Sequence, residues 1–210
     1  RSYKQFFAMT NYEGDYDYSV YWIGNFSEKT IQGLNYLSKH SDKKNKKRIL
    51  IKDKKINLFS YLVSKTIIKN YYISKLINLV FRKYKKTFYS KIVNYNEAFY
   101  PQDRYTDWNK IYGKNGFFEI QFMIPREKFI EILGEISFFL KQNHIFSPFV
   151  VFKKYNEKGK YLNFCGKGYS VSFDFEINEN KKKLEKFFNS LFLKNELKVN
   201  FSKDLITNKK

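Results

Sequence analysis

The sequence predicts an α+β fold in which a large, mainly antiparallel sheet is backed by helices. Two periodicities support this prediction. Apolar and polar residues alternate from 169 to 177, as in a strand with two unlike faces. From 129 to 140, apolar residues recur at intervals of three and four, as on one face of a helix. Along the second half of the chain, the order strand, helix, strand, strand, helix favours helices that pack on one sheet.

Four segments are expected to be strands. Residues 17–26 are rich in aromatic and β-branched side chains, and residues 149–153 have the same character. Residues 117–124 end at Pro125, which cannot donate a hydrogen bond to a neighbouring strand. In residues 169–177, the alternation predicts one apolar face and one wet or functional face, the latter carrying Ser170, Ser172, Asp174 and Glu176.

Two helices are expected to cover the apolar face of the sheet. The first begins near Pro125, a residue favoured in the first turn of a helix. Its apolar stripe contains Phe129, Ile132, Leu133, Ile136, Phe139 and Leu140. The second has a similar stripe made of Leu184, Phe187, Phe188 and Leu191.

Two lysine-rich segments precede this region. Residues 58–86 are predicted to form an amphipathic helical segment, with lysines opposite Ile68, Tyr72, Leu76 and Leu79. A core-facing role is favoured for it, and contact with a membrane surface or a lipid-linked substrate is the alternative. Residues 39–55 are expected to be a solvated, Lys-rich hairpin or insertion loop, with a phosphate- or membrane-binding patch as the alternative.

The chain is strongly basic, with a formal net charge of +20 from 40 basic and 20 acidic residues. Five of the basic residues are Arg and the other 35 are Lys. Proteins that recognise nucleic acids usually rely on Arg for bidentate contacts to phosphate and guanine. Because Arg is scarce here, no nucleic-acid partner is expected. The charge would still attract a phosphorylated substrate or an anionic membrane surface.

Composition also limits the cellular compartment in which the protein is expected. Cys165 is the only cysteine, so no intrachain disulfide is possible, and with two distant histidines a metal site is not supported. The longest apolar stretch, residues 61–81, is interrupted by lysines, and no signal-peptide pattern is present. We therefore expect a location in the cytoplasm or at the periphery of a membrane.

The chain contains no self-contained catalytic motif. GKNG at 113–116 and GKG at 166–168 read as turns, because neither leads from a strand into a helix as a dinucleotide-binding loop does. No nucleophile elbow, HExxH or CxxC occurs. The residues alone therefore predict a basic α+β domain with a polar-faced sheet. Because the sequence begins at Arg1 without Met, we expect it to be a piece of a longer protein.

Six short motifs, in their order along the chain, indicate more about the protein than its composition and periodicity do. Together they resemble the FAD-linked oxidases of the vanillyl-alcohol oxidase type, most closely the decaprenylphosphoryl-ribose 2-oxidases and more distantly the aldonolactone oxidases. The motifs are DYDYSVYWI at 15–23, AFYPQDRYTDWNKIYG at 98–113, GFFEIQFMIP at 116–125, SPFVVFKKY at 147–155, GYSVSFDFEI at 168–177 and NFSKD at 200–204.

This resemblance implies a domain organisation. Residues 1–199 would form the substrate-binding cap domain, whose antiparallel sheet covers the flavin. Residues 200–210 would begin the segment that returns to an FAD-binding domain outside this sequence. FAD is therefore the expected cofactor, bound mainly by that other domain, and the piece alone is expected to be inactive.

The resemblance also assigns two lysines. Lys203, in SKD, matches a lysine beside the flavin, where a cation stabilises negative charge on the reduced ring and binds the substrate hydroxyl. Lys153, in VFKKY, matches a pocket lysine suited to a sugar hydroxyl or a phosphate. Composition alone would make Lys203 a surface residue and Lys153 an edge-strand charge. The assignment requires both lysines to lie on one face of the sheet.

Five further residues are expected to contact substrate. Glu119 and Gln121 lie two apart on one strand and so share a face, and they match a pair of pocket residues that is usually two glutamines. Ser172 stands where some members have cysteine, and Asn200 where tyrosine is more usual. Tyr100 belongs to the longest motif. Glu119 adds a negative charge that would change substrate preference.

By this resemblance, the full-length protein would oxidise a sugar CH–OH, in the first instance the 2-hydroxyl of a polyprenyl-phosphate-linked pentose, and a reductase partner would complete an epimerisation. An aldonolactone of the D-arabinono-1,4-lactone type, or another small polyol, is the alternative substrate. A second alternative has no enzymatic activity: a basic module that binds an anionic membrane or nucleic acid.

Overall fold

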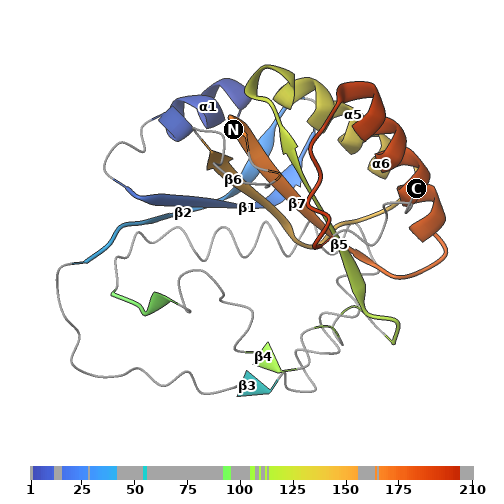
Figure 1. The fold of residues 1–210 in the computed structure, drawn as a ribbon, viewed down its shortest axis with the longest axis horizontal. Coiled ribbons are helices and arrows are strands. Elements are labelled where there is room, and N and C mark those ends of the chain that lie inside the picture. Colours follow the sequence, from blue (N-terminus) through green and yellow to red (C-terminus); the bar gives the residue numbers. More distant parts are fainter. Residues whose placement is uncertain are drawn as a thin grey trace.

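The computed structural model describes residues 2–11, 16–27, 29–41, 54–55, 92–95, 105–106, 109, 112, 114–155, 164 and 166–203. Figure 1 shows the elements that these residues form. In chain order they are α1 (Tyr3–Asn11), β1 (Tyr18–Phe26), β2 (Ile31–Ser38), β3 (Lys54–Lys55), β4 (Tyr105–Thr106), β5 (Phe117–Ile124), the 3-10 turn η2 (Arg126–Lys128), α5 (Phe129–Gln142), β6 (Val150–Tyr155), β7 (Gly168–Glu176) and α6 (Lys181–Asn195).

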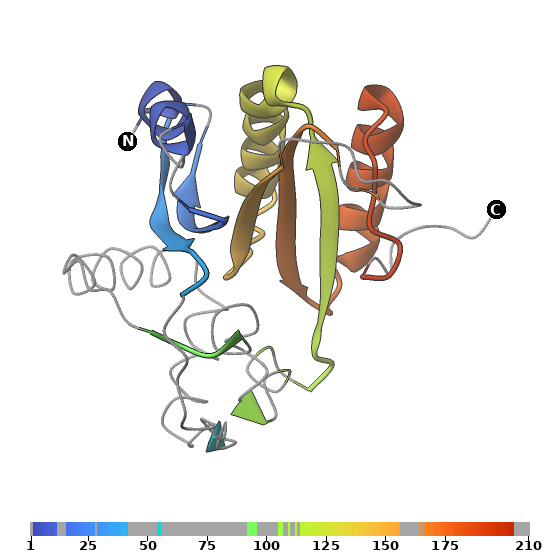
Figure 2. The ribbon, with the colours of Figure 1, turned by 60° about the vertical axis from the view of Figure 1, so that its left-hand side comes forward.

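Five of these strands form one sheet in the order β2-β1-β6-β7-β5. Every neighbouring pair in this sheet is antiparallel. Helices α1, α5 and α6 lie along one side of it (Figures 1 and 2). The described residues therefore have the α+β architecture that the sequence predicts. The two short strands β3 and β4 form a separate parallel pair.

Large apolar side chains fill the space between the sheet and the helices. Phe122 of β5 and Phe173 of β7 are fully buried, and their rings stack with centroids 6.2 Å apart. From α5, Phe129 reaches Tyr169 of β7 at 4.4 Å between ring centroids. Phe188 of α6 packs against Phe122. Burial of so many aromatic rings is the main force that holds the helices on this face.

The opposite face of the sheet, here called the polar face, follows from the strand register. Glu119 pairs with Asp174 and Gln121 with Ser172, while Lys153 pairs with Ser170. Directly opposed residues of antiparallel strands point to the same side of the sheet. The polar face therefore carries Glu119, Gln121, Lys153, Ser170, Ser172 and Asp174.

Most of the predicted elements are observed. The strand at 117–124 has the predicted bounds, and the strands expected at 17–26, 149–153 and 169–177 appear as β1, β6 and β7. Both predicted helices form, as α5 and α6. Helix α1 and strand β2 were not predicted, because their sequences lack a clear period and β2 contains Gly33 and Asn35.

One expectation about β7 needs correction. The face with Ser170, Ser172 and Asp174 is not wet: these side chains are 1%, 8% and 8% exposed. They are covered because side chains from β5 and from more distant segments lie over them, as described below. Of the lysine-rich loop at 39–55, residues 39–41 are exposed and 54–55 form β3, and residues 42–53 lie outside the described residues, as does all of 58–86.

Gly168 is the first residue of β7 and has a positive φ of 147°, a conformation that L side chains rarely adopt. A Cβ placed on it would lie 2.3 Å from the backbone oxygen of Ile124 on β5. The glycine therefore permits the close approach of β7 to the end of β5.

We predict that Gly168→Ala destabilises the fold by about 1–3 kcal/mol or more, because it combines backbone strain with a backbone clash. Gly166→Ala is the matched control, since a Cβ there meets nothing within 4 Å. It should change the free energy of unfolding by less than about 1 kcal/mol. Chemical denaturation of both variants measures the difference, and equal effects would contradict the argument.

Candidate functional site

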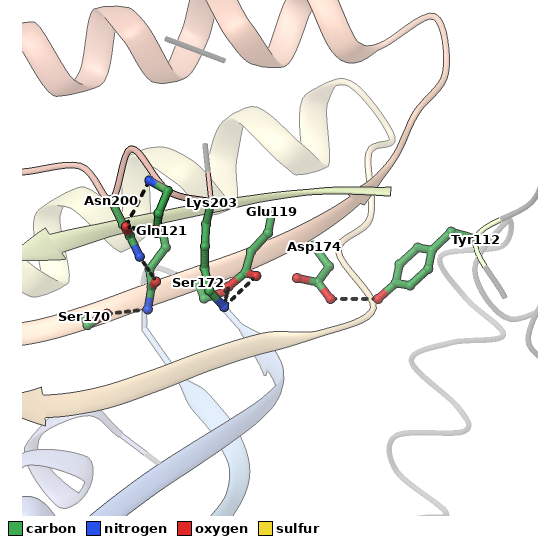
Figure 3. Close-up of polar contacts among 9 residues, drawn as sticks. Tyr112, Glu119, Gln121, Ser170, Ser172, Asp174, Asn200 and Lys203 are labelled. Carbon is green, nitrogen blue, oxygen red and sulfur yellow. Dashed lines mark hydrogen bonds and ion pairs between the residues drawn. The ribbon is translucent and has the colours of Figure 1, made fainter. Parts of the chain in front are cut away.

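The candidate site lies where β5 and β7 meet on the polar face. Their eight-residue antiparallel register sets polar side chains side by side across the two strands. Figure 3 shows the polar contacts along this seam in three groups, around Gln121, Glu119 and Asp174.

The segment after α6 brings two more residues onto the seam. Val199 forms an antiparallel bridge with Phe122. The Met123 amide donates to the Lys198 carbonyl, and the Asn200 amide donates to the Gln121 carbonyl, each at 2.8 Å. These bonds satisfy backbone groups along the outer edge of β5 and fix the chain there. A turn follows, in which the Lys203 amide donates to the Asn200 carbonyl at 3.1 Å.

Lys203 and Glu119 form the central contact of the site. The Lys203 ammonium donates to Glu119 Oε2 at 3.0 Å and to Oε1 at 3.2 Å. The Ser172 hydroxyl donates to Glu119 Oε1 at 2.5 Å. Because the Lys203 side chain is 49% exposed, this ion pair adds little to stability. Its main consequence is positional, since it fixes an ammonium over the polar face.

A neutral hydrogen-bonded group lies next to this pair. Gln121 donates through Nε2 to the Ser170 hydroxyl at 3.1 Å and accepts at Oε1 from Asn200 Nδ2 at 2.6 Å. The Asn200 Oδ1 in turn accepts from the backbone amide and the hydroxyl of Ser202. Asn200 therefore links the turn to β5, in the place where the resembled family usually has tyrosine.

The third group contains a buried carboxyl. Tyr112, only 1% exposed, donates its hydroxyl to Asp174 Oδ2 at 2.8 Å. The pKa of Asp174 is raised from 3.8 to about 7: burial is the largest cause and the charge of Glu119 adds to the rise, while the Tyr112 hydrogen bond and the Lys203 charge oppose it. Burial also raises the pKa of Tyr112 well above its ordinary value. Tyr112 therefore stays neutral and acts as a donor.

The structure brings most of the predicted site residues together. Glu119, Gln121, Ser172, Asn200 and Lys203 are linked by the contacts above, and their roles toward a substrate stay predictions. Lys153 lies on the same face, one strand further on, where it pairs with Ser170. Lys153 and Lys203 therefore share a face: the register places Lys153 on it, and the ion pair with Glu119 places Lys203 over it. Tyr100 lies outside the described residues.

Tyr112 and Asp174 were not predicted as site residues, although both belong to motifs of the sequence. Tyr112 is near the end of the motif at 98–113, and Asp174 is one of the alternating polar residues of β7. Phe173 and Phe175, on either side of Asp174, point to the opposite face of the strand and so gave no sign that its carboxyl is buried. Its partner, 62 residues away in sequence, could not be read from the pattern.

Two further properties bear on the type of site. Within the described part of the chain, no three His, Cys, Asp or Glu side chains are grouped so that they could hold a metal ion. Among the same residues, no helix has the length and apolar character needed to cross a membrane.

Comparison with known proteins shows a similarity to an oxidase. Over 92 residues, the chain is 32% identical to the decaprenylphosphoryl-beta-D-ribose oxidase of Mycolicibacterium smegmatis. The match covers 43% of this chain and spans one fifth, 20%, of that oxidase. No protein-family model matches the chain. The similarity supports, for that part of the chain, the predicted relationship to FAD-linked oxidases.

We predict that Asp174→Asn changes the pH dependence of stability. An acid whose pKa is raised in the folded state contributes stability below its unfolded pKa and loses it as pH rises. For Asp174 the loss falls between about pH 4 and pH 7. Because each unit of pKa corresponds to about 1.4 kcal/mol, the variant should gain up to a few kcal/mol over the unmodified protein above pH 7.

Denaturation by urea at pH 4.5 and pH 8 measures this effect. Glu127→Gln, at an exposed position of η2, is the matched control and should follow the unmodified protein at both pH values. Parallel pH dependences for Asp174→Asn and the unmodified protein would contradict the buried-carboxyl assignment.

Proposed function

We propose that this chain is the substrate-binding part of a flavin-dependent oxidoreductase that oxidises a sugar CH–OH, with the 2-hydroxyl of a polyprenyl-phosphate-linked pentose as the leading substrate. The observation that carries the proposal is the Lys203–Glu119–Ser172 cluster, which fixes an ammonium on a polar sheet face. The similarity to a decaprenylphosphoryl-beta-D-ribose oxidase supports the choice of chemistry.

The residues present fit one edge of a flavin. An ammonium has three N–H groups, and two of those of Lys203 are directed at the Glu119 carboxylate. One N–H remains for another acceptor, and about half of the side chain is exposed. Lys203 would therefore be the residue of this chain that faces the ring. When bound, FAD would supply the acceptor for the hydride of the carbinol carbon.

The chain's own contribution is to orient the alcohol and stabilise charge. Lys203 would bind the hydroxyl oxygen and stabilise the negative charge that develops during oxidation. Glu119 would keep Lys203 in place, because both of its oxygens accept from the ammonium. The amide of Gln121, held by Ser170 and Asn200, offers a rigid polar surface for the other hydroxyls of a sugar.

The phosphate of the leading substrate would be met by Lys153, which lies on the same face two strands from Glu119. A lysine suits this task as a mobile point charge. The ketone product would then need a reductase partner if the overall reaction is an epimerisation. Association with a membrane surface would follow from the lipid part of the substrate.

Glu119 and Asp174 favour a second candidate, an aldonolactone or another small polyol. Two carboxyl groups lie opposite each other on β5 and β7, next to the Lys203 ammonium. Above the pKa of Asp174 the three groups sum to a net charge of −1, which disfavours a phosphate nearby. A neutral polyol does not meet this repulsion and gains an acceptor for its hydroxyls in Glu119.

The first test uses the full-length protein with its flavin. Under anaerobic conditions, mixing with polyprenyl-phosphoribose should bleach the oxidised flavin. Lys203→Gln should lower the rate constant of bleaching by about 10²–10³, because it removes a charge that acts on the transition state. Lys198→Gln, an exposed lysine five residues earlier, is the matched control and should bleach at the unmodified rate. Equal rates in the two variants would contradict the role of Lys203.

The second test separates the two substrates. We expect Glu119→Gln to raise kcat/KM for the phosphate-linked sugar relative to a soluble lactone by about tenfold, since removing one negative charge near the site favours the anion by about 1.4 kcal/mol. Steady-state turnover on both substrates gives the ratio. An unchanged ratio would show that Glu119 does not face the substrate.

A further inference from the structure

The proposed function leaves one buried pair without a task. Tyr112 and Asp174 are 1% and 8% exposed and are joined by a hydrogen bond of 2.8 Å. The Tyr112 ring is held by stacking on Phe117, with 4.4 Å between ring centroids. The pair lies beside the Glu119–Lys203 contact, with Asp174 next to Glu119 (Figure 3). A buried carboxyl is costly to maintain, so its retention next to a charged pair calls for an explanation.

Few charged groups act on Asp174 among the described residues. Its carboxyl is acted on by Tyr112, by Glu119 on β5 and by Lys203 from the C-terminal turn. The side facing β6 offers only neutral partners: the Asp174 amide donates to the Phe149 carbonyl, and the Ser147 hydroxyl donates to the Asp174 carbonyl. The backbone of Asp174 is thus fixed, and only its carboxyl is left to respond to charge.

We propose that Tyr112 and Asp174 are positioning residues of this site: the Asp174 carboxyl, bonded by the Tyr112 hydroxyl, carries a titratable proton beside Glu119, and the presence of that proton sets how strongly the Lys203 ammonium is bound within the chain. The inference rests on the proposed function for its consequence in catalysis. Its electrostatic part concerns only the four side chains Tyr112, Glu119, Asp174 and Lys203.

The net charge of this cluster depends on the protonation state of Asp174. With Asp174 protonated, Glu119 and Lys203 balance each other and the cluster is neutral. With Asp174 ionised, one ammonium faces two carboxylates, so Lys203 is bound more firmly and the cluster carries −1. An anionic ligand is then repelled, and less of the lysine's charge is available to stabilise negative charge on the reacting groups. Because Asp174 titrates at about pH 7, both states are populated near neutrality.

Tyr112 has a separate part in this pair. Its hydroxyl donates to the ionised carboxyl and so favours the charged form. Without this bond, burial and Glu119 would raise the pKa of Asp174 further and keep the proton bound at higher pH. The hydrogen bond from Tyr112 therefore keeps the pKa of Asp174 near 7. Van der Waals contact with the tyrosine ring alone would not lower this pKa.

Infrared difference spectroscopy of the full-length, flavin-loaded protein tests the electrostatic part. The unmodified protein should show a protonated carboxyl band that is lost as pH rises through about 7. Asp174→Asn should abolish this titration. Tyr112→Phe, which keeps the stacked ring, should move its midpoint to higher pH. Lys203→Gln should also raise the midpoint and Glu119→Gln should lower it, because the charges of these groups act in those directions.

Steady-state kinetics from pH 6 to pH 8 tests the consequence. KM for the phosphate-linked sugar should rise severalfold through the midpoint in the unmodified protein and stay flat in Asp174→Asn. In Tyr112→Phe, the same rise should appear at higher pH. KM for a neutral lactone should not follow the titration.

The two tests fail separately. A carboxyl titration that survives in Asp174→Asn, or that does not move in Tyr112→Phe and Glu119→Gln, overturns the inference. If the titration behaves as stated but no sugar alcohol reduces the flavin, the proposed function fails while the proton-holding pair stands. If Asp174→Asn lowers only stability and leaves the pH profile of KM unchanged, the pair is merely structural and the inference is overturned.

Discussion

The antiparallel register of β5 and β7 is the constraint on which the site depends. It sets Glu119 opposite Asp174 and Gln121 opposite Ser172, while Phe122 and Phe173 point to the other side. A slip of one residue would move every polar side chain of β5 into the aromatic core. The register is held by those aromatic rings, and at its end by Gly168, which allows β7 to approach Ile124. The packing of the aromatic core therefore determines on which face of the sheet the charged side chains lie.

The site is a charge cluster rather than a set of independent contacts. Glu119 alone, partly buried, would be repelled by Asp174 and poorly solvated, and the ammonium of Lys203 offsets both costs. Removing Glu119 or Lys203 changes the pKa of Asp174, so effects of single substitutions will not add. The neutral group around Gln121 differs in kind, because its members exchange hydrogen bonds without any change of charge.

Much of this fold could be predicted from periodicity, because β5, β7, α5 and α6 are each apolar on one face and bury it. The polar face was also predictable, since the alternation in β7 places Ser170, Ser172 and Asp174 together. Its burial was not predictable, because the covering groups come from Tyr112 and from the turn at 200–203, far away in the sequence. A shifted pKa depends on this tertiary desolvation, which no local pattern encodes.

The local charge of the site differs from that of the chain. The sequence carries +20, but the cluster of Glu119, Asp174 and Lys203 is neutral or negative. A basic surface draws anions toward the protein at long range and is screened by salt, whereas the cluster acts over a few ångströms, well inside the screening length. The net charge of the chain would therefore attract an anionic substrate, whereas the cluster with Asp174 ionised would repel an anion placed next to it. A neutral substrate would be insensitive to both, so ionic strength and pH act on different steps only if the substrate carries a phosphate.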